Sequence, residues 1–319
     1  MLHVFLMDKT NRKMKQNLML KAYTWLIITI RDCGPITLKE INRMWKENKI
    51  DDGNDLDRYK FYRYKKEIEE AYSLFIDYDK NKGYFISNPT IFRKGSIENW
   101  MLSTMAVNYA IGDCTDIKGR IGVENIPSSE HFLKEIIQAM RKTHELQITY
   151  QAYGAENATI YKVQPYFLKL YHQRWYVIGP SDTRPIITLA LDRIKNATDT
   201  QLIFLMDTTL TVDDYLKDCY GVMRDEQLEA EEILIKAYGH EVNVLRDLPL
   251  HGSQKEVEIG EGWSDFRLRL RPSWDFIGKL MERGSRIKVL EPASVVAKIW
   301  TKYAESVKLY ENNEETFEV

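Results

Sequence analysis

The chain has 319 residues, of which 44% are hydrophobic and 29% are charged. This length predicts two or three domains at about 150 residues each, and the composition is typical of a soluble globular protein. The formal net charge is only −2, yet residues 1–95 carry 19 basic and 13 acidic side chains. A basic N-terminal part on an acidic remainder indicates a polyanionic partner for the N-terminal part.

The sequence does not support a membrane protein or a secreted protein. The longest apolar stretch, residues 18–30, is shorter than the roughly 20 residues that span a bilayer, and Lys21 interrupts it. The first eight residues have no basic segment before their apolar run and no small-residue cleavage site, so they do not form a signal peptide. The cysteines are odd in number and far apart (Cys33, Cys114 and Cys219), which favours a reducing cytoplasm over a disulfide framework.

Three helices are expected near the N-terminus. Apolar residues recur at helical spacing over about 15–32, where Cys-Gly-Pro follows. Thr37 can cap a second helix, and Glu40 three residues later completes a capping box. Asp55 or Asp57 can cap a third helix that runs to about residue 72.

A hairpin follows these helices. Residues 74–79 alternate as a strand does, residues 81–83 supply a turn, and residues 84–86 return. Three helices followed by a hairpin is the order of a winged helix-turn-helix, which we therefore expect over residues 1–90.

The third helix is the candidate DNA reader. Its apolar residues (Leu56, Phe61, Tyr64 and Ile68) are expected to pack inward. Arginine and lysine reach guanine edges and phosphates from a helix in the major groove, and tyrosine can hold the backbone. The candidate DNA-binding residues on the outward face and at the hairpin tip are Arg58, Tyr59, Lys60, Tyr62, Arg63, Lys66 and Lys82. The alternative is a solvated basic face with no partner.

The rest of the chain divides into a linker and two further domains. Residues 91–124 are expected to form a helical linker, and Pro127 opens a helix that ends near Lys142. Four or five short runs rich in β-branched and aromatic residues then predict a small β-barrel over 125–205. Strand and helix patterns alternate over 225–312, which predicts an α/β domain.

Catalytic motifs are missing from the sequence. The six histidines form no metal-binding pair, and no phosphate-binding glycine loop or nucleophile elbow occurs. The three lone cysteines are interpreted as buried small hydrophobic residues rather than nucleophiles. We expect no catalytic residues, no metal and no cofactor.

Residues 163–194 resemble the WYL domain, a family named for a Trp-Tyr-Leu triplet. The resemblance rests on Arg174-Trp175-Tyr176-Val177, the preceding Gln164-Pro165-Tyr166 and the closing Leu191-Asp192-Arg193-Ile194. Val177 stands where the family has leucine, and Gln164 where many relatives have histidine. Residues 56–88 look like the winged-helix reader usually fused to this domain. Residues 119–150 resemble the helical lead-in, and residues 284–300 resemble the C-terminal extension.

The resemblance implies a bacterial transcriptional regulator of multidomain α+β fold. It combines the winged helix-turn-helix, an Sm/SH3-like small β-barrel that senses a nucleic acid or nucleotide, and a ferredoxin-like α/β extension. Aromatic faces beside cationic groups suit single-stranded bases and phosphates. The candidate ligand residues are Tyr150, Tyr166, Lys169, Arg174, Tyr176 and Arg193. The alternative to ligand binding is a purely structural role for these segments. In that case Trp175 and Val177 pack in the barrel core, and Asp192 forms an ion pair with Arg193.

The sequence thus predicts a cytoplasmic regulator that binds a double-stranded operator as a homodimer, without membrane contact. The first alternative is an effector that binds single-stranded nucleic acid and uses its winged helix to contact proteins. A third possibility is an enzyme whose active site is assembled from scattered residues.

Overall fold

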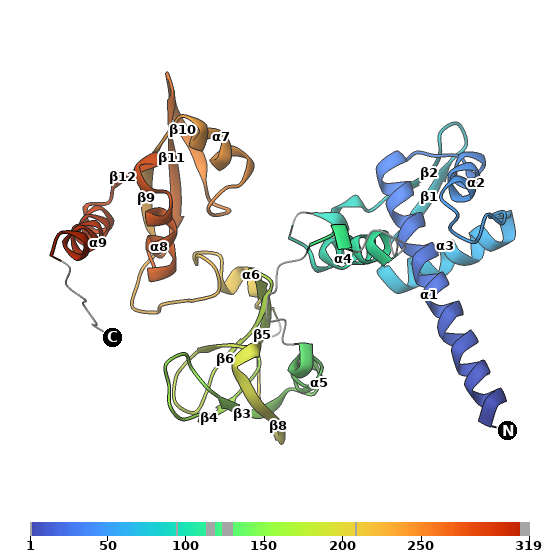
Figure 1. The fold of residues 1–319 in the computed structure, drawn as a ribbon, viewed down its shortest axis with the longest axis horizontal. Helices are drawn as coiled ribbons and strands as arrows, with labels where there is room; N and C mark the ends of the chain where they lie inside the picture. Colours follow the sequence, from blue (N-terminus) through green and yellow to red (C-terminus); the bar gives the residue numbers. More distant parts are fainter. Residues whose placement is uncertain (1, 94, 113–118, 123–129, 208, 313–319) are drawn as a thin grey trace. The chain divides into compact units, whose positions relative to one another are not determined.

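The computed structural model describes residues 2–93, 95–112, 119–122, 130–207 and 209–312 (Figure 1). The described residues form two compact units, divided after residue 123. Cys114, part of the 91–124 linker and the Pro127 helix start lie outside the described residues.

The first unit contains four helices and a hairpin among its described residues. They are α1 (Leu2–Cys33), α2 (Leu38–Glu47), α3 (Arg58–Tyr72), β1 (Ile76–Asp79), β2 (Gly83–Ile86), the short 3-10 helix η1 (Pro89–Phe92) and α4 (Ile97–Gly112). This is the predicted order, although α1 begins well before the expected start near residue 15.

Local capping explains where α2 and α3 begin. The Thr37 hydroxyl accepts a hydrogen bond from the Glu40 amide at 3.3 Å, and the Glu40 carboxylate accepts one from the Thr37 amide at 3.2 Å. The expected capping box is therefore confirmed. Asp57 caps α3 by accepting from the Lys60 amide at 2.8 Å, whereas Asp55 accepts from the side chain of Asn42.

The first unit has one core. The four predicted inward residues of the third helix are all buried, and they pack with Trp45 of α2 and with residues of α1 and β2. The Phe61 and Tyr84 rings meet edge to face, with centroids 4.7 Å apart. This contact fixes α3 against the hairpin.

The second unit begins with η3 (Glu130–Phe132) and α5 (Leu133–Lys142), followed by two three-stranded antiparallel sheets. One sheet has the order β4 (Thr159–Val163), β3 (His144–Tyr150), β8 (Ile194–Ile203). The other has the order β5 (Phe167–Tyr171), β6 (Arg174–Gly179), β7 (Ile187–Ala190), and the short helix η4 (Leu191–Arg193) precedes β8.

The expected barrel is not closed. Among the described strands, none of one sheet pairs with a strand of the other, and an isolated bridge between Val163 and Ser181 links the end of β4 to the segment after β6. Strands β4 and β5 are separated at Pro165, which has no N–H to donate to a ladder. Gly179 is required where the sheets approach, because a Cβ there would lie 1.8 Å from the Gln164 carbonyl oxygen.

The two sheets share a core with α5. Val177 is fully buried in it, beside Ile148 and Leu189, and Trp175 packs against it while partly exposed. The structural alternative for Trp175 and Val177 is therefore confirmed: both side chains belong to the packing of this core.

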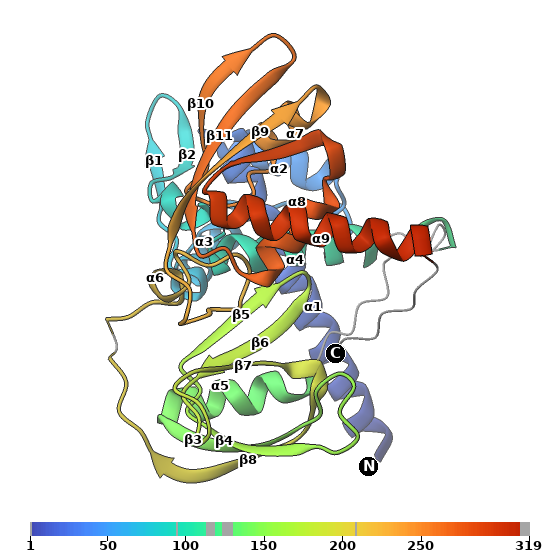
Figure 2. The ribbon, with the colours of Figure 1, turned by 90° about the vertical axis from the view of Figure 1, so that its left-hand side faces the viewer.

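The C-terminal part of the second unit is a four-stranded antiparallel sheet with helices. Its elements are α6 (Val212–Tyr215), β9 (Glu231–Tyr238), α7 (His240–Asp247), β10 (Lys255–Gly260), β11 (Trp263–Leu270), α8 (Trp274–Glu282), η5 (Gly284–Arg286), β12 (Ile287–Glu291) and α9 (Ala293–Asn312). The strand order is β10-β11-β9-β12. Figure 2 shows β10 and β11 as a long hairpin at one edge of this sheet.

None of the described helices combines the length and apolar character that a membrane crossing requires. The described residues also contain no group of three or more His, Cys, Asp or Glu side chains that could hold a metal ion.

Candidate functional site

The outward face of α3 carries cations and aromatic rings. The side chains of Arg58, Tyr59, Tyr62, Arg63 and Lys66 are exposed, and Tyr59 is 80% exposed. The Arg58 guanidinium lies 5.6 Å from the centre of the Tyr62 ring. Such contacts orient an arginine while its N–H groups remain available to a partner.

Lys60 differs from the expectation that it points outward. Its ammonium pairs with the Asp51 carboxylate, and both side chains are only 19% exposed. The same ammonium lies 5.6 Å from the centre of the Trp45 ring. The ion pair therefore joins α3 to the loop before it. It also compensates the charge of the Lys60 ammonium.

The hairpin is tied to the outward face of α3. The hydroxyls of Tyr62 and Tyr84 lie 3.1 Å apart, and hydrogen bonds with Tyr84 and Arg58 lower the pKa of Tyr62. At the hairpin tip, the Asp79 carboxylate accepts from the amide of Lys82 at 3.0 Å, and the Lys82 side chain is exposed. The hairpin that carries Lys82 is thus bonded to the face of α3 through Tyr84.

A second cluster lies in the second unit, where the start of β6, the helix η4 and the end of β3 meet. Arg174 forms an ion pair with Asp192 and donates to the Tyr153 hydroxyl at 2.6 Å. The Arg193 guanidinium lies 4.3 Å from the centre of the Tyr153 ring and 5.4 Å from that of Tyr150. Asp192 therefore pairs with Arg174, rather than with Arg193 as the structural alternative had it.

This Arg174–Arg193 cluster has unused bonding capacity. The Nε atoms of both arginines and Oδ1 of Asp192 are buried and have no hydrogen-bond partner among the described residues. A phenol is protonated at neutral pH and can donate, and burial raises the pKa of Tyr150 and of Tyr176 further. Two guanidiniums beside aromatic faces can bind an anionic group and an attached flat ring.

Four of the six predicted ligand residues (Tyr150, Arg174, Tyr176 and Arg193) lie in or beside this cluster. The other two lie elsewhere. Tyr166 stacks on Phe204 with ring centres 5.5 Å apart, and the Lys169 ammonium lies 3.6 Å from the Asp213 carboxylate.

Tyr153 is the residue of this cluster that sequence reasoning missed. It lies in the loop after β3 and is 69% exposed, yet its ring and hydroxyl contact both arginines. Sequence spacing carried no signal for it, because its partners lie 21 and 40 positions further along the chain.

Comparison with known proteins identifies the domain that carries this cluster. Residues 131–199 match the family model of the WYL domain. No curated protein matches the chain.

Two solved structures resemble the chain at low identity. Proteasome accessory factor B/C (PafBC) of Arthrobacter aurescens is 13% identical, with a TM-score of 0.38 over 95% of this chain and 48% of that one. This chain therefore spans about half the length of PafBC. A CRISPR Cas-related protein is 12% identical, with a TM-score of 0.38 over 93% of this chain and 84% of that one.

Proposed function

We propose that this WYL-domain protein is a DNA-binding transcriptional regulator in which a ligand of the WYL domain controls operator binding. The observation that carries the proposal is the exposed, cationic and aromatic face of α3, which is fixed to a hairpin with an exposed lysine at its tip. This arrangement supports assigning residues 1–90 to a winged helix-turn-helix.

In the proposed complex α3 enters the major groove. Arg58 and Arg63 are both exposed and lie about 1.4 turns apart, so we assign them to different base edges, while Tyr59, Tyr62 and Lys66 contact phosphates. Lys82 would reach the flanking backbone as the tip of the wing. Lys60 has no part in this interface because it pairs with Asp51.

The ligand would bind at the Arg174–Arg193 cluster. Two guanidiniums beside the exposed Tyr153 ring suit a phosphate-bearing base, so a nucleotide or a short single strand is the ligand class we propose. The chain would act through binding alone, with no reaction and no cofactor. The C-terminal part supports a ferredoxin-like assignment through its strand–helix order and its sheet order β10-β11-β9-β12.

Two copies of the chain would read two half-sites, as dimeric readers of this class do. The ligand then controls operator affinity only if it binds more tightly to one arrangement of the two readers than to the other. The coupling between ligand and operator is reciprocal: operator DNA changes ligand affinity by the same factor.

The test is binding of the purified chain to the duplex upstream of its own gene, across a salt series, with unrelated duplex and single-stranded competitors. We expect a complex that outlasts unrelated duplex and weakens steeply with salt. Binding to no duplex at any salt would refute the regulator.

The Arg174–Arg193 cluster also favours a second function, an effector that binds single-stranded nucleic acid and uses its winged helix to contact proteins. The same experiment separates the two functions. Tighter binding to single strands than to any duplex selects the effector, and specific duplex binding selects the regulator.

A further inference from the structure

A hollow lies within the C-terminal part of the second unit, between α8, α9 and the loop that precedes β9. Its volume of about 620 Å³ falls in the range of about 300–1,000 Å³ that small-molecule pockets span. Its wall is mostly apolar and is formed by Leu228, Pro272, Trp274, Ile277, Met281 and Ala297. An apolar hollow with a few polar groups at its rim is the usual form of a small-molecule site.

The Trp274 ring is a fixed part of this wall. A Cβ at position 278 would lie 2.6 Å from Cζ3 of the ring, so the glycine at 278 is what lets the indole lie against α8. Although the ring is held in this way, Trp274 is 79% exposed. A held indole with an exposed surface can stack on a second flat ring.

The other walls are bonded in place as well. Nη1 of Arg271 donates to the carbonyl of Asp225 at 3.2 Å and to the carbonyl of Leu228, and these bonds tie the loop to the end of β11. The Tyr303 hydroxyl donates to the Met281 carbonyl at 3.0 Å, which joins α9 to α8. The hollow therefore exists without a ligand to shape it.

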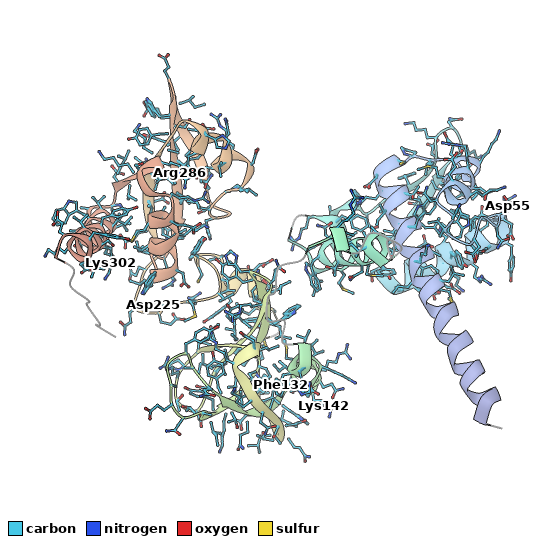
Figure 3. The ribbon with its side chains drawn as sticks, in the orientation of Figure 1. Asp55, Phe132, Lys142, Asp225, Arg286 and Lys302 are labelled. Carbon is cyan, nitrogen blue, oxygen red and sulfur yellow. The ribbon has the colours of Figure 1, made fainter. Side chains whose placement is uncertain are left out.

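The charged side chains around the hollow leave one cation uncompensated. The Asp225 carboxylate accepts from the Gln227 amide at 2.9 Å, and the Glu305 carboxylate pairs with the Lys302 ammonium at 2.8 Å (Figure 3 labels Asp225 and Lys302). Lys298 lines the hollow and forms no ion pair or hydrogen bond with any residue that the structure describes. The free charge at the rim is therefore positive, which favours a ligand with one negative charge.

We propose that this hollow binds a flat aromatic acid, a small molecule with an aromatic ring body and one carboxylate. The ring would stack on Trp274, the carboxylate would pair with Lys298, and the Thr301 hydroxyl would donate to it. Lys298 and Thr301 are three residues apart, so they lie on the same side of α9. A single free cation matches a carboxylate better than a doubly charged phosphate. This site is distinct from the Arg174–Arg193 cluster, and the inference goes beyond the proposed function and does not rest on it.

The test is calorimetric titration of the full chain with naphthoate. Two matched probes are naphthamide, which has the same shape without the charge, and decanoate, which has the charge on a flexible chain. We expect one naphthoate to bind per chain, about tenfold more tightly than either matched probe, because only naphthoate offers both the flat ring and the charge.

Four variants assign the binding to this hollow. Lys298→Met should lower naphthoate affinity about tenfold and leave naphthamide affinity unchanged, because it removes only the charge. Trp274→Leu should weaken both naphthyl probes, and Ala297→Trp should abolish the binding of both because it fills the hollow. Lys288→Met removes an exposed lysine of β12 outside the hollow and should bind as wild type. All four positions are exposed, so each variant is expected to melt near the wild-type temperature.

Three results would overturn the proposal. The first is the absence of naphthoate binding, or naphthoate binding that Ala297→Trp leaves unchanged. The second is equal loss of naphthoate affinity in Lys298→Met and Lys288→Met, which would make the effect one of overall charge. The third is tighter binding of decanoate than of naphthoate, which would exclude an aromatic ligand. Because no DNA is present in these titrations, none of the three results bears on operator binding.

Discussion

The Tyr62 hydroxyl on α3 lies 3.1 Å from the Tyr84 hydroxyl on β2. Tyr84 is buried, while Tyr62 is exposed beside Arg58. The bond therefore joins the core of the first unit to its cationic surface, and the orientation of Arg58 depends on the hairpin as well as on α3. A mutation in the hairpin is thus expected to change the orientation of Arg58 without altering α3 itself.

Arg58 and Arg63 are predicted to read bases. Replacing each with alanine should weaken duplex binding by about 1–3 kcal/mol per base contact, because a bidentate arginine–guanine pair is lost. Titration of operator duplex with each variant measures the change. Arg267→Ala, which removes an exposed arginine from β11, is the control for loss of charge alone. Unchanged affinity in the double variant would contradict the assignment of α3.

Lys60 is predicted to stabilise the fold rather than to bind DNA. Lys60→Met leaves the Asp51 carboxylate without its partner, so the free energy of unfolding should fall by about 1–3 kcal/mol. Urea denaturation measures that change, and Lys60→Met with Asp51→Asn should recover part of it. Operator affinity of the folded Lys60→Met variant should stay within about twofold of wild type. A loss as large as that of Arg58→Ala would place Lys60 in the interface.

Local signals predicted α2 and α3, whereas α7 and two strands exposed on both faces were missed. The Thr37–Glu40 box and the buried spacing of α3 lie within a few residues of sequence. By contrast, every residue of β10 except Gly260 is exposed, so no alternation reveals the strand, and its pairing with β11 forms it. Strand β8 was missed for the same reason, because seven of its ten residues are exposed.

The Arg174–Arg193 cluster was only partly predictable. The Trp-Tyr-Val run lies on β6 and the Asp192-Arg193 pair on η4, but the sequence did not show that Asp192 would pair with Arg174, 18 residues away. That contact forms because β6 lies beside η4, and this tertiary arrangement cannot be inferred from sequence spacing. Lys169 was included for its charge alone, and its nearest carboxylate, Asp213, belongs to α6.

Tyr153 is predicted to be a stacking residue of the ligand site. Tyr153→Ala should lower affinity for a short oligothymidylate by about 1–3 kcal/mol, the range for one base–aromatic stack. Tyr153→Phe keeps the ring and should bind nearly as wild type, although it loses the 2.6 Å bond from Arg174. Fluorescence anisotropy with labelled oligothymidylate measures both. If the two variants lose affinity equally, the hydroxyl and not the ring carries the effect.

His251 is predicted to make the second unit less stable in acid. Its Nδ1 lies 2.7 Å from the Ser253 hydroxyl, and burial lowers its pKa below the ordinary value of 6.5. Below about pH 6.5 the unfolded chain binds a proton that the folded chain does not, so stability falls as the pH drops toward the folded-state pKa.

Urea denaturation between about pH 8 and pH 5 measures this dependence. His251→Gln cannot titrate and should flatten it, although the variant loses stability at pH 8 along with the buried imidazole. His240→Gln, which changes an exposed histidine at the start of α7, should keep the wild-type dependence. A wild-type slope in the His251 variant would assign the acid sensitivity to another group, because only a group that still titrates can produce it.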